Sequence, residues 1–283
     1  MSELIDESTG EIIESEVVDG SLILASQERG QIDIQIATAK KYPRSVDKAR
    51  KDVLTLATLN EKVAGDCFYM LPRDKKPIEG PSSRFAEILQ YGWGNIRSQG
   101  DVIGIDDKYV VAVGMAFDLE KNSAYKVSVK RKITNKYGKR YTDDMIGVTA
   151  NAAVSIAIRN AILKVIPKPL WWDIYEAARK ASLGKGRTIQ KKRDEMLTWF
   201  KKVGLNEKQV CEIVGARGMD DIGEEQLITL LGLMTAIKDG DTSVDQILSK
   251  GHIETEGTAE INKVMKEAIE AGVYPPGEIT PPI

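Results

Sequence analysis

The sequence has very few of the residues that build metal centres and disulfide frameworks. Its two cysteines, Cys67 and Cys211, lie far apart in the chain, and its only histidine is His252. A zinc site of ordinary ligand spacing needs four such side chains, so none can be assembled. Two distant thiols in a chain of 283 residues are typical of reduced cysteines in the cytosol. We therefore expect a cytoplasmic protein without a metal.

Long apolar runs, an export signal and catalytic motifs are also lacking. No run approaches the roughly 20 apolar residues that cross a bilayer, and the N-terminus is acidic where a secretory signal is basic and then apolar. Gly184-Lys-Gly-Arg-Thr188 lacks the spacing of a Walker A loop, and no glycine fingerprint for a dinucleotide follows a strand. We expect no membrane partner, no cofactor and no enzymatic activity.

Charge is distributed unevenly along a chain whose net charge is only −2. Residues 1–28 carry eight acidic and no basic side chains, and residues 194–283 carry seventeen acidic against eight basic ones. The remaining residues, 29–193, hold 32 basic and 17 acidic side chains, a net charge of +15. A basic middle between acidic ends is expected of a polyanion-binding protein, and clustered charges on an ordinary solvated surface are the alternative.

The pattern of apolar residues divides the chain into four parts. Residues 1–30 are acidic and lack periodicity, which predicts a flexible arm with one short strand near Ser21–Leu24. Residues 31–183 are expected to form the domain that binds nucleic acid. Glycine-punctuated, helix-sized blocks over 188–250 predict a small all-α domain, and 251–283 read as an acidic, proline-rich tail.

Three strands followed by a long helix are predicted inside the second part. Val, Ile, Tyr and Phe are enriched over 96–104, 108–119 and 123–133, and the three-residue gaps between these segments predict antiparallel hairpins. A helix over 145–166 ends at Pro167. The fold class is therefore α+β, with an antiparallel three-stranded β-β-β-α core. Two further helices are expected before the sheet, over 45–67 and 83–90.

The third predicted strand carries a row of cations. Strand periodicity places Lys126, Lys130 and Lys132 on one face and Arg131 on the other. Residues two apart on a strand stand roughly 6–7 Å apart, which is close to the phosphate spacing of an extended nucleic-acid strand. A solubilising outer face, or an edge strand protected by lysine, is the alternative.

The basic character continues into the loop after this strand. Residues 121–142 contain eight Lys or Arg and no acidic side chain, and the loop itself contributes Lys139 and Arg140. Tyr137 and Tyr141 lie among these cations. Aromatic rings interleaved with basic residues are typical of surfaces on which unpaired bases stack.

The predicted long helix is apolar on most of its surface. A narrow polar line of Asn151, Ser155 and Arg159 follows it at i, i+4 and i+8. An arginine on a nearly buried helix requires an anionic partner or strong hydrogen bonds. A phosphate and a carboxylate of the protein itself fit this spacing equally well.

Several short motifs occur in a familiar order. Ile78-Glu79-Gly80, a short helix Arg84–Leu89 and Tyr91-Gly92-Trp93 precede the sheet, and an alanine-containing basic segment, Ala157–Lys164, follows it. This order, over roughly 45–180, resembles the single-strand annealing recombinases of the Rad-fifty-two, RecT and Erf types. The resemblance implies a phage-encoded protein that binds and anneals single-stranded DNA without ATP during homologous recombination. It also implies a groove that runs around a ring or helical oligomer.

The resemblance assigns roles to residues at the positions that match. Arg159 and Lys164 would line the groove and Arg84 would lie near its turn, whereas Asn160 and Leu163 stand where the family has a richer basic cluster. Together with the strand and the loop, this gives the DNA-binding residues that we expect: Lys126, Lys130, Lys132, Arg131, Lys139, Arg140, Arg159, Lys164, Arg84 and Tyr137.

Other functions remain open on the sequence. A passive single-stranded DNA-binding protein would protect a strand without pairing it, and an oligomeric scaffold would be basic without binding DNA. Acidic residues near the hairpins, such as Asp106 and Asp107, have the chemistry to hold Mg²⁺ in a nuclease, although a tight turn accounts for them equally. The partners that we expect are single-stranded DNA, further copies of the chain, and a nuclease or a host single-strand binding protein.

Overall fold

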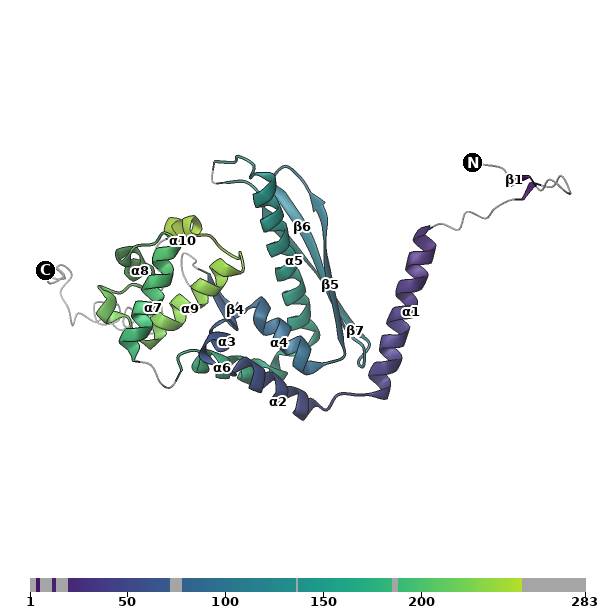
Figure 1. Ribbon diagram of the computed structural model, residues 1–283, viewed down its shortest axis with the longest axis horizontal. Coiled ribbons are helices and arrows are strands. Elements are labelled where there is room, and N and C mark those ends of the chain that lie inside the picture. The colour runs from purple at the N-terminus through teal and green to yellow at the C-terminus, as the bar shows by residue number, and fades with distance from the viewer. Residues whose placement is uncertain are drawn as a thin grey trace, which may run out of the picture.

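A three-stranded antiparallel sheet with a long helix packed on one face forms the centre of the structure (Figure 1). Strands β5 (Ile96–Ile105), β6 (Tyr109–Asp118) and β7 (Ser123–Lys132) lie side by side in chain order, so β6 is the middle strand. The predicted antiparallel pairing of three successive strands is confirmed. The computed structural model describes residues 4–5, 12–13, 20–71, 78–135, 137–184 and 188–250. The predicted tail over 251–283 lies outside them.

Helix α5 (Asp143–Val165) begins and ends at the signals that its sequence provides. The Thr142 side chain accepts a hydrogen bond from the backbone N–H of Met145 at the N-terminus, and two aspartates in the first turn complement the helix dipole. The helix stops just before Pro167, whose ring cannot continue it. The prediction of a helix over 145–166 is confirmed, with a start two residues earlier.

Helix α5 lies unusually close to the middle strand. A Cβ atom placed on Gly114 of β6 would lie 2.2 Å from the carbonyl carbon of Ala157 in α5. A Cβ atom on Gly100 of β5 would lie 2.7 Å from Cγ1 of Ile158. Small residues at this crossing therefore let the helix backbone approach the sheet directly.

Among the helices of the described part, only α5 is long and apolar enough to cross a membrane. The sequence did not predict α5 to be such a helix, because no continuous apolar run is long enough. In the structure, 56% of its apolar window is buried inside the protein. The helix covers the sheet with that surface (Figure 1). This apolar character is accounted for by its packing on the sheet.

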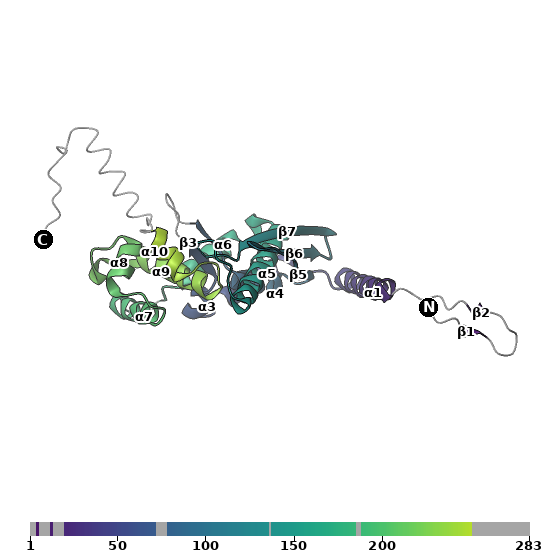
Figure 2. The ribbon, with the colours of Figure 1, turned by 90° about the horizontal axis from the view of Figure 1, so that it is seen from above.

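The N-terminal part differs from the expectation. Residues 20–30, predicted to belong to a flexible arm with a strand near Ser21–Leu24, form the start of helix α1 (Gly20–Lys41). Ile32, Ile36 and Ala39 recur at helical spacing on its less exposed side. This helical period lies after residue 30, and the helix extends back from it through residues 20–30. Figure 2 shows α1 at the opposite end of the molecule from the C-terminal helices. Before α1, strands β1 (Leu4–Ile5) and β2 (Ile12–Ile13) pair with each other.

The single helix predicted over 45–67 is two helices in the structure. Helix α2 (Val46–Ala57) is capped by Ser45, and α3 (Glu61–Gly65) is capped by Asn60, whose side chain accepts a hydrogen bond from the backbone N–H of Val63. A capping asparagine starts a new helix because its side chain competes for the backbone N–H groups. The break between them was missed because the apolar spacing continues through it.

A second layer of elements surrounds the C-terminal half of α5. Strands β3 (Phe68–Leu71) and β4 (Ile78–Pro81) form a hairpin that the sequence did not predict, followed by α4 (Ser83–Trp93) and α6 (Trp172–Ala181). The fully buried ring of Phe85 packs edge-on against an aromatic ring of α6. These elements and α2 share one apolar core with α5.

The C-terminal helices meet the β3–β4 hairpin through α9, which packs against β3 (Figure 1). Their core includes Met70 of β3, and a Cβ atom on Gly232 would lie 3.0 Å from the Met70 Cβ atom. Helical blocks therefore occur where the sequence predicted them, and they share a core residue with the preceding part. The helices are α7 (Ile189–Lys202), α8 (Glu207–Val214), α9 (Glu224–Lys238) and α10 (Val244–Lys250).

A buried cluster of charges joins the segment after α1 to the turn between β6 and β7. The Arg44 guanidinium donates to both oxygens of Asp118, at 2.6 and 2.7 Å, and to Oε1 of Glu120 at 2.8 Å. The side chains of Arg44 and Asp118 are only 6% and 5% exposed. Burial alone raises the pKa of both acids, but hydrogen bonds from Arg44 and from neighbouring N–H groups outweigh it and leave each pKa below its ordinary value.

Replacing Gly114 by alanine should lower the free energy of unfolding by about 1–3 kcal/mol or more, because the added methyl group meets the backbone of α5. Urea denaturation followed by circular dichroism measures the change. Gly104→Ala, in β5, is the matched control, because nothing lies within 4 Å of its added Cβ atom. Equal denaturation midpoints for the two variants would contradict the close packing.

Removing the Arg44 guanidinium should have an effect that depends on pH. Arg44→Gln removes the guanidinium from the buried Asp118 carboxylate and from the partly buried Glu120 carboxylate, so we expect a loss of about 3–5 kcal/mol at neutral pH. The folded-state pKa values of Asp118 and Glu120 lie below their ordinary values of 3.8 and 4.5. The stabilisation by Arg44 is therefore fully present above the ordinary pKa values, and it is lost as the pH falls through the folded-state pKa values. Urea titrations of both proteins from about pH 7 to about pH 3 should therefore converge. Arg217→Gln, at an exposed site, is the control, and a gap independent of pH would be the contrary result.

Candidate nucleic-acid interface

The lysines of β7 stand together on the outer face of the sheet, away from α5. Lys126, Lys130 and Lys132 are exposed, whereas Val127 and Val129 are half-buried. The alternation predicted from strand periodicity is therefore confirmed. Strand β7 lies at one edge of the three-stranded sheet, so the row has no neighbouring strand on its far side within that sheet.

The side chains of β6 that neighbour this row on the outer face are apolar or aromatic. Lys126 lies opposite Met115, and Lys130 lies opposite Val111 on the middle strand. The Lys130 ammonium group lies 4.1 Å from the ring centroid of Tyr109, which is a cation–π contact. A row of ammonium groups thus borders a strip of apolar and aromatic side chains.

The loop after β7 is shaped by one side chain. Asn135 Oδ1 accepts hydrogen bonds from the backbone N–H groups of Tyr137 and Lys139, at 2.9 and 3.0 Å. This tight turn, with Gly138 at a φ of +81°, leaves the Tyr137 side chain 81% exposed and Lys139 exposed. Both therefore lie beyond the end of β7 that carries Lys132.

The neighbouring Arg140 ties this loop to the turn between β5 and β6. Its guanidinium donates to the carbonyl oxygen of Asp106 at 2.7 Å and lies 3.8 Å from the Asp107 carboxylate. Asp106 Oδ1 in turn accepts from the backbone N–H groups of Lys108 and Tyr109, and these bonds lower its pKa. The carboxylates considered for a nuclease site therefore shape the turn.

Arg131 and Arg159 lie on the other side of the sheet, apart from the lysine row. The Arg159 guanidinium donates to Oδ2 of Asp241 at 3.0 Å, and the two side chains are 7% and 4% exposed. It also lies 4.6 Å from the ring centroid of Tyr69. Arg131 donates to the carbonyl oxygens of Gly240 and Asp241, and burial lowers its pKa. The anionic partner required by Arg159 is a carboxylate of the protein itself.

The two remaining predicted residues lie on exposed helix surfaces. Arg84, in the first turn of α4, pairs with Glu87 at 2.8 Å, and Lys164 lies in the last turn of α5. The structure thus brings together the residues of β7 and its loop, and separates them from the arginines on the inner side. Arg131 and Arg159 therefore do not extend the lysine row: Arg131 is on the opposite face of β7, as the alternation predicts, and Arg159 on the helix behind is paired with Asp241.

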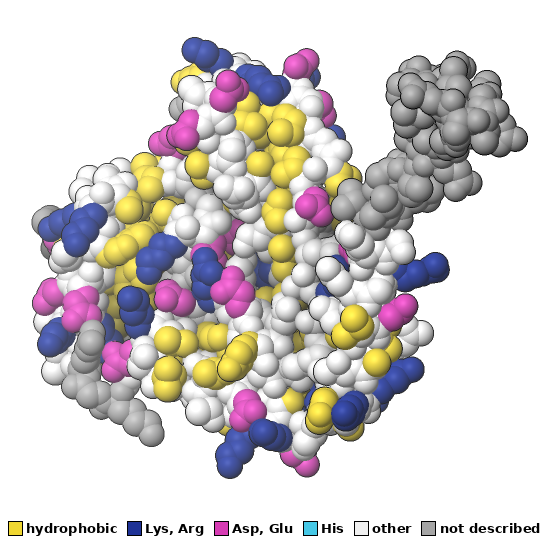
Figure 3. All heavy atoms as spheres, turned by 45° about the vertical axis from the view of Figure 1, so that its right-hand side comes forward, with side chains coloured by type: hydrophobic (Ala, Val, Ile, Leu, Met, Phe, Trp, Pro, Cys, Tyr) yellow, Lys and Arg dark blue, Asp and Glu magenta, His cyan; other side chains and the backbone are white. Residues whose placement is uncertain are grey.

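One contributor to this region was missed from the sequence. The turn Asp239–Asp241 between α9 and α10 supplies the anion to Arg159, from a position 82 residues away. Its only local signal is a glycine after a helix, which indicates a helix end and no partner. Figure 3, a view of one face, shows basic side chains spread among acidic ones around a narrow band of hydrophobic side chains.

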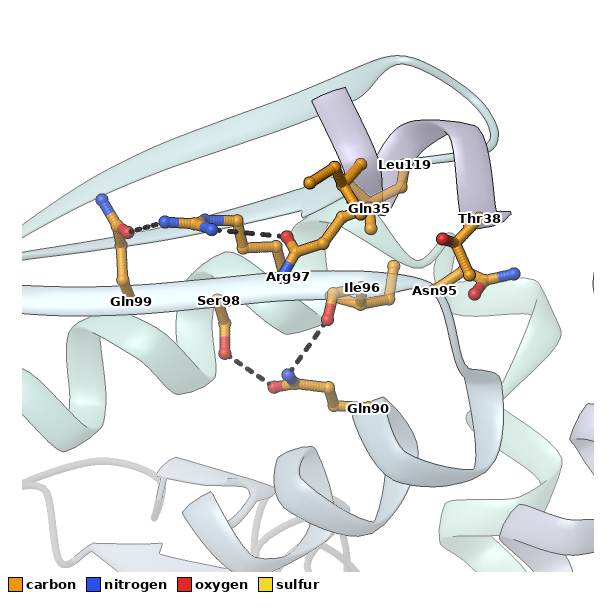
Figure 4. A pocket seen from close by; sticks show the side chains of 10 residues that line it. Gln35, Thr38, Gln90, Asn95, Ile96, Arg97, Ser98, Gln99 and Leu119 are labelled. Atoms are coloured by element: carbon orange, nitrogen blue, oxygen red, sulfur yellow. Dashed lines mark hydrogen bonds between the residues drawn. The ribbon is translucent and has the colours of Figure 1, made fainter. Parts of the chain in front are cut away.

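A separate polar hollow of about 520 Å³ lies between α1 and β5 (Figure 4). Arg97 crosses it and donates to the side-chain oxygens of Gln35 and Gln99, while Gln90 joins Ser98 to the backbone of Ile96. Most of its polar groups therefore satisfy one another, and Arg97 joins α1 to β5 through Gln35 and Glu28.

In the described part of the chain, no group of three or more His, Cys, Asp or Glu side chains is placed to hold a metal ion. No protein-family model, curated protein or solved structure matches this chain. The arrangement of cations on and behind β7 is therefore the basis on which a function can be argued.

Proposed function

We propose that the protein binds single-stranded DNA and anneals complementary strands without ATP, in homologous recombination. The observation that carries the proposal is the row of Lys126, Lys130 and Lys132, all exposed on one face of an edge strand. Lys130 and Lys132 are two residues apart, which is roughly 6–7 Å along a strand, and Lys126 lies four residues before Lys130, at roughly twice that distance. An extended nucleic-acid strand offers its phosphates at a similar spacing, so each ammonium group can neutralise one phosphate and release a counterion.

The row suits annealing because it reads no bases. Contacts to the sugar-phosphate backbone position a strand without regard to its sequence, and they leave the base edges free to pair. The nearby rings of Tyr109 and Tyr137 offer surfaces on which bases stack, which is also independent of sequence. Lys139 extends the basic surface past the end of the strand.

Each part of the chain has a role in the proposed function. We propose that the β-β-β-α core is the DNA-binding part, that 188–250 act as a small all-α domain, and that 251–283 are an acidic tail. We further propose a phage-encoded, cytoplasmic protein that assembles into a ring or filament. Its proposed protein partners are a nuclease or a host single-strand binding protein. No nucleotide hydrolysis and no cofactor enter this function.

Reversing two charges of the row should weaken binding uniformly across sequences. For Lys130→Glu with Lys132→Glu we expect the slope of log affinity against log salt to flatten by about 1.4, because each single-strand phosphate contact contributes about 0.7. Fluorescence anisotropy with labelled oligonucleotides measures it. Lys201→Glu with Lys202→Glu is the matched control, with the same charge change at exposed positions of α7. An unaltered slope in the row variant would place the groove elsewhere.

Annealing distinguishes this proposal from passive binding. Mixed with two complementary oligonucleotides, one carrying a fluorophore and the other a quencher, the protein should speed pairing without ATP or Mg²⁺. The row variant should lose most of this acceleration, and the α7 control should keep it. A passive single-strand binding protein would slow pairing or leave it unchanged, and that result would reject the annealing function.

A further inference from the structure

The turn between α9 and α10 brings an acidic segment against arginines from three elements. Asp241 contacts Arg159 of α5, and the carbonyl oxygens of the turn accept hydrogen bonds from Arg131 of β7. Arg84 of α4 lies close enough to act on the charge of Asp239. The three arginines belong to the basic part of the chain, and the turn belongs to the acidic C-terminal part.

The contact reproduces the way in which arginine binds phosphate. A guanidinium group binds carboxylate and phosphate oxygens through the same planar donors. Here Arg159 holds a carboxylate oxygen at 3.0 Å, and Arg131 holds the adjoining carbonyl oxygen of Gly240 at 2.6 Å. The acidic turn therefore occupies donors that suit a phosphodiester.

Strand β7 connects this buried site to the lysine row. Arg131 stands between Lys130 and Lys132 on the same edge strand, with its side chain on the opposite face. A nucleic-acid strand that follows this edge meets lysines on one side and, once the turn has moved, Arg131 on the other.

The contact is incompletely satisfied, which offsets part of the stabilisation that its ion pair provides. Oδ1 of Asp241 and Oδ2 of Asp239 are buried and accept no hydrogen bond in the described structure. Each such oxygen costs the free energy of its lost hydration. Burial also raises the pKa of Asp239, although the nearby guanidinium groups of Arg84 and Arg159 act to lower it.

A glycine seats the turn on α5. Gly240 has a φ of +72°, a conformation that other residues adopt at a cost, and a Cβ atom placed there would lie 3.2 Å from the Cβ atom of Ala152. The close fit of the turn therefore depends on this one position.

We propose that the turn Asp239–Asp241 is an autoinhibitory contact that occupies Arg131 and Arg159 until a strand phosphate displaces it. This inference rests on the proposed binding of single-stranded DNA. Closed molecules bind through the lysine row alone, and release of the turn adds the two arginines. The apparent affinity is then reduced by the fraction of molecules that are closed.

The direct test removes the charge of the turn. Asp241→Asn should bind a labelled oligothymidylate of about 30 nucleotides roughly tenfold more tightly than the unchanged protein in anisotropy titrations at moderate salt. Asp220→Asn is the matched control, because it changes the net charge equally at a side chain that is 97% exposed. Its affinity should stay within about twofold of the unchanged protein.

Two further variants separate release of the turn from a change in charge. Gly240→Ala keeps every charge but opposes the seated conformation, so it too should tighten binding. Adding Arg159→Gln to Asp241→Asn should abolish the gain, because the freed arginine is what binds the phosphate. A purely structural ion pair predicts no gain in any of these proteins.

A measurement on the unchanged protein covers variants that fail to fold. Addition of the oligonucleotide should speed amide hydrogen exchange at 239–241, whose N–H groups bond to the end of α9. Slower or unchanged exchange would overturn the autoinhibitory role of the turn, and so would unchanged affinity of folded Asp241→Asn and Gly240→Ala. If the lysine-row variant still weakened binding in that case, the proposed binding of single-stranded DNA would stand. If the unchanged protein and every variant failed to bind even at low salt, the proposed function itself would be rejected.

Discussion

The close approach of α5 to β6 is the constraint on which the rest of the structure depends. Gly114 and Ala157 bring the two backbones together where a methyl group would not fit. Because the helix fills the inner face of the sheet, the valines of β7 turn toward the helix and the lysines of β7 turn outward. The close contact between Gly114 and α5 therefore determines which face of the sheet each cation of β7 occupies.

The two sides of β7 place similar charges in different surroundings. On the outer face, Lys130 and Lys132 are in water, where a charge interacts weakly with its neighbours and is free to meet a mobile anion. On the inner side, Arg159 is nearly excluded from water and is held by a carboxylate and an aromatic ring. Arginine suits the inner side because it stays charged when buried, and lysine suits the outer face because its ammonium group is strongly hydrated.

The sequence was most informative where one periodicity dominated. The three strands were predicted within two residues at each end, because alternation and short turns leave few other arrangements. Helix α5 was predicted because a threonine cap and Pro167 mark its ends. Helix α1 was missed because the short apolar run Ser21–Leu24 fits either a helix or a strand when its neighbours are not considered.

Only the part of the candidate site that depends on local sequence, the lysine row, could be predicted. The lysine row follows from strand periodicity, which needs no knowledge of the fold. The partner of Arg159 comes from a turn 82 residues away, and no local pattern indicates that α9 packs on β3 and so brings Asp241 to α5. Pairing between distant charges is decided by tertiary packing, so the sequence left phosphate and carboxylate as equal alternatives.

The guanidinium of Arg44 has a further consequence for the strand that carries the lysines. Asp118 lies opposite Ser123 at the turn where β7 begins, with its carboxylate turned to the inner side. A pairing of β7 one residue out of step would turn the lysines of β7 inward, and it would change the length of the turn that holds Glu120 in place for its hydrogen bond from Arg44. Arg44, which lies outside the sheet, therefore stabilises the β6–β7 turn in the alignment that directs the lysines outward.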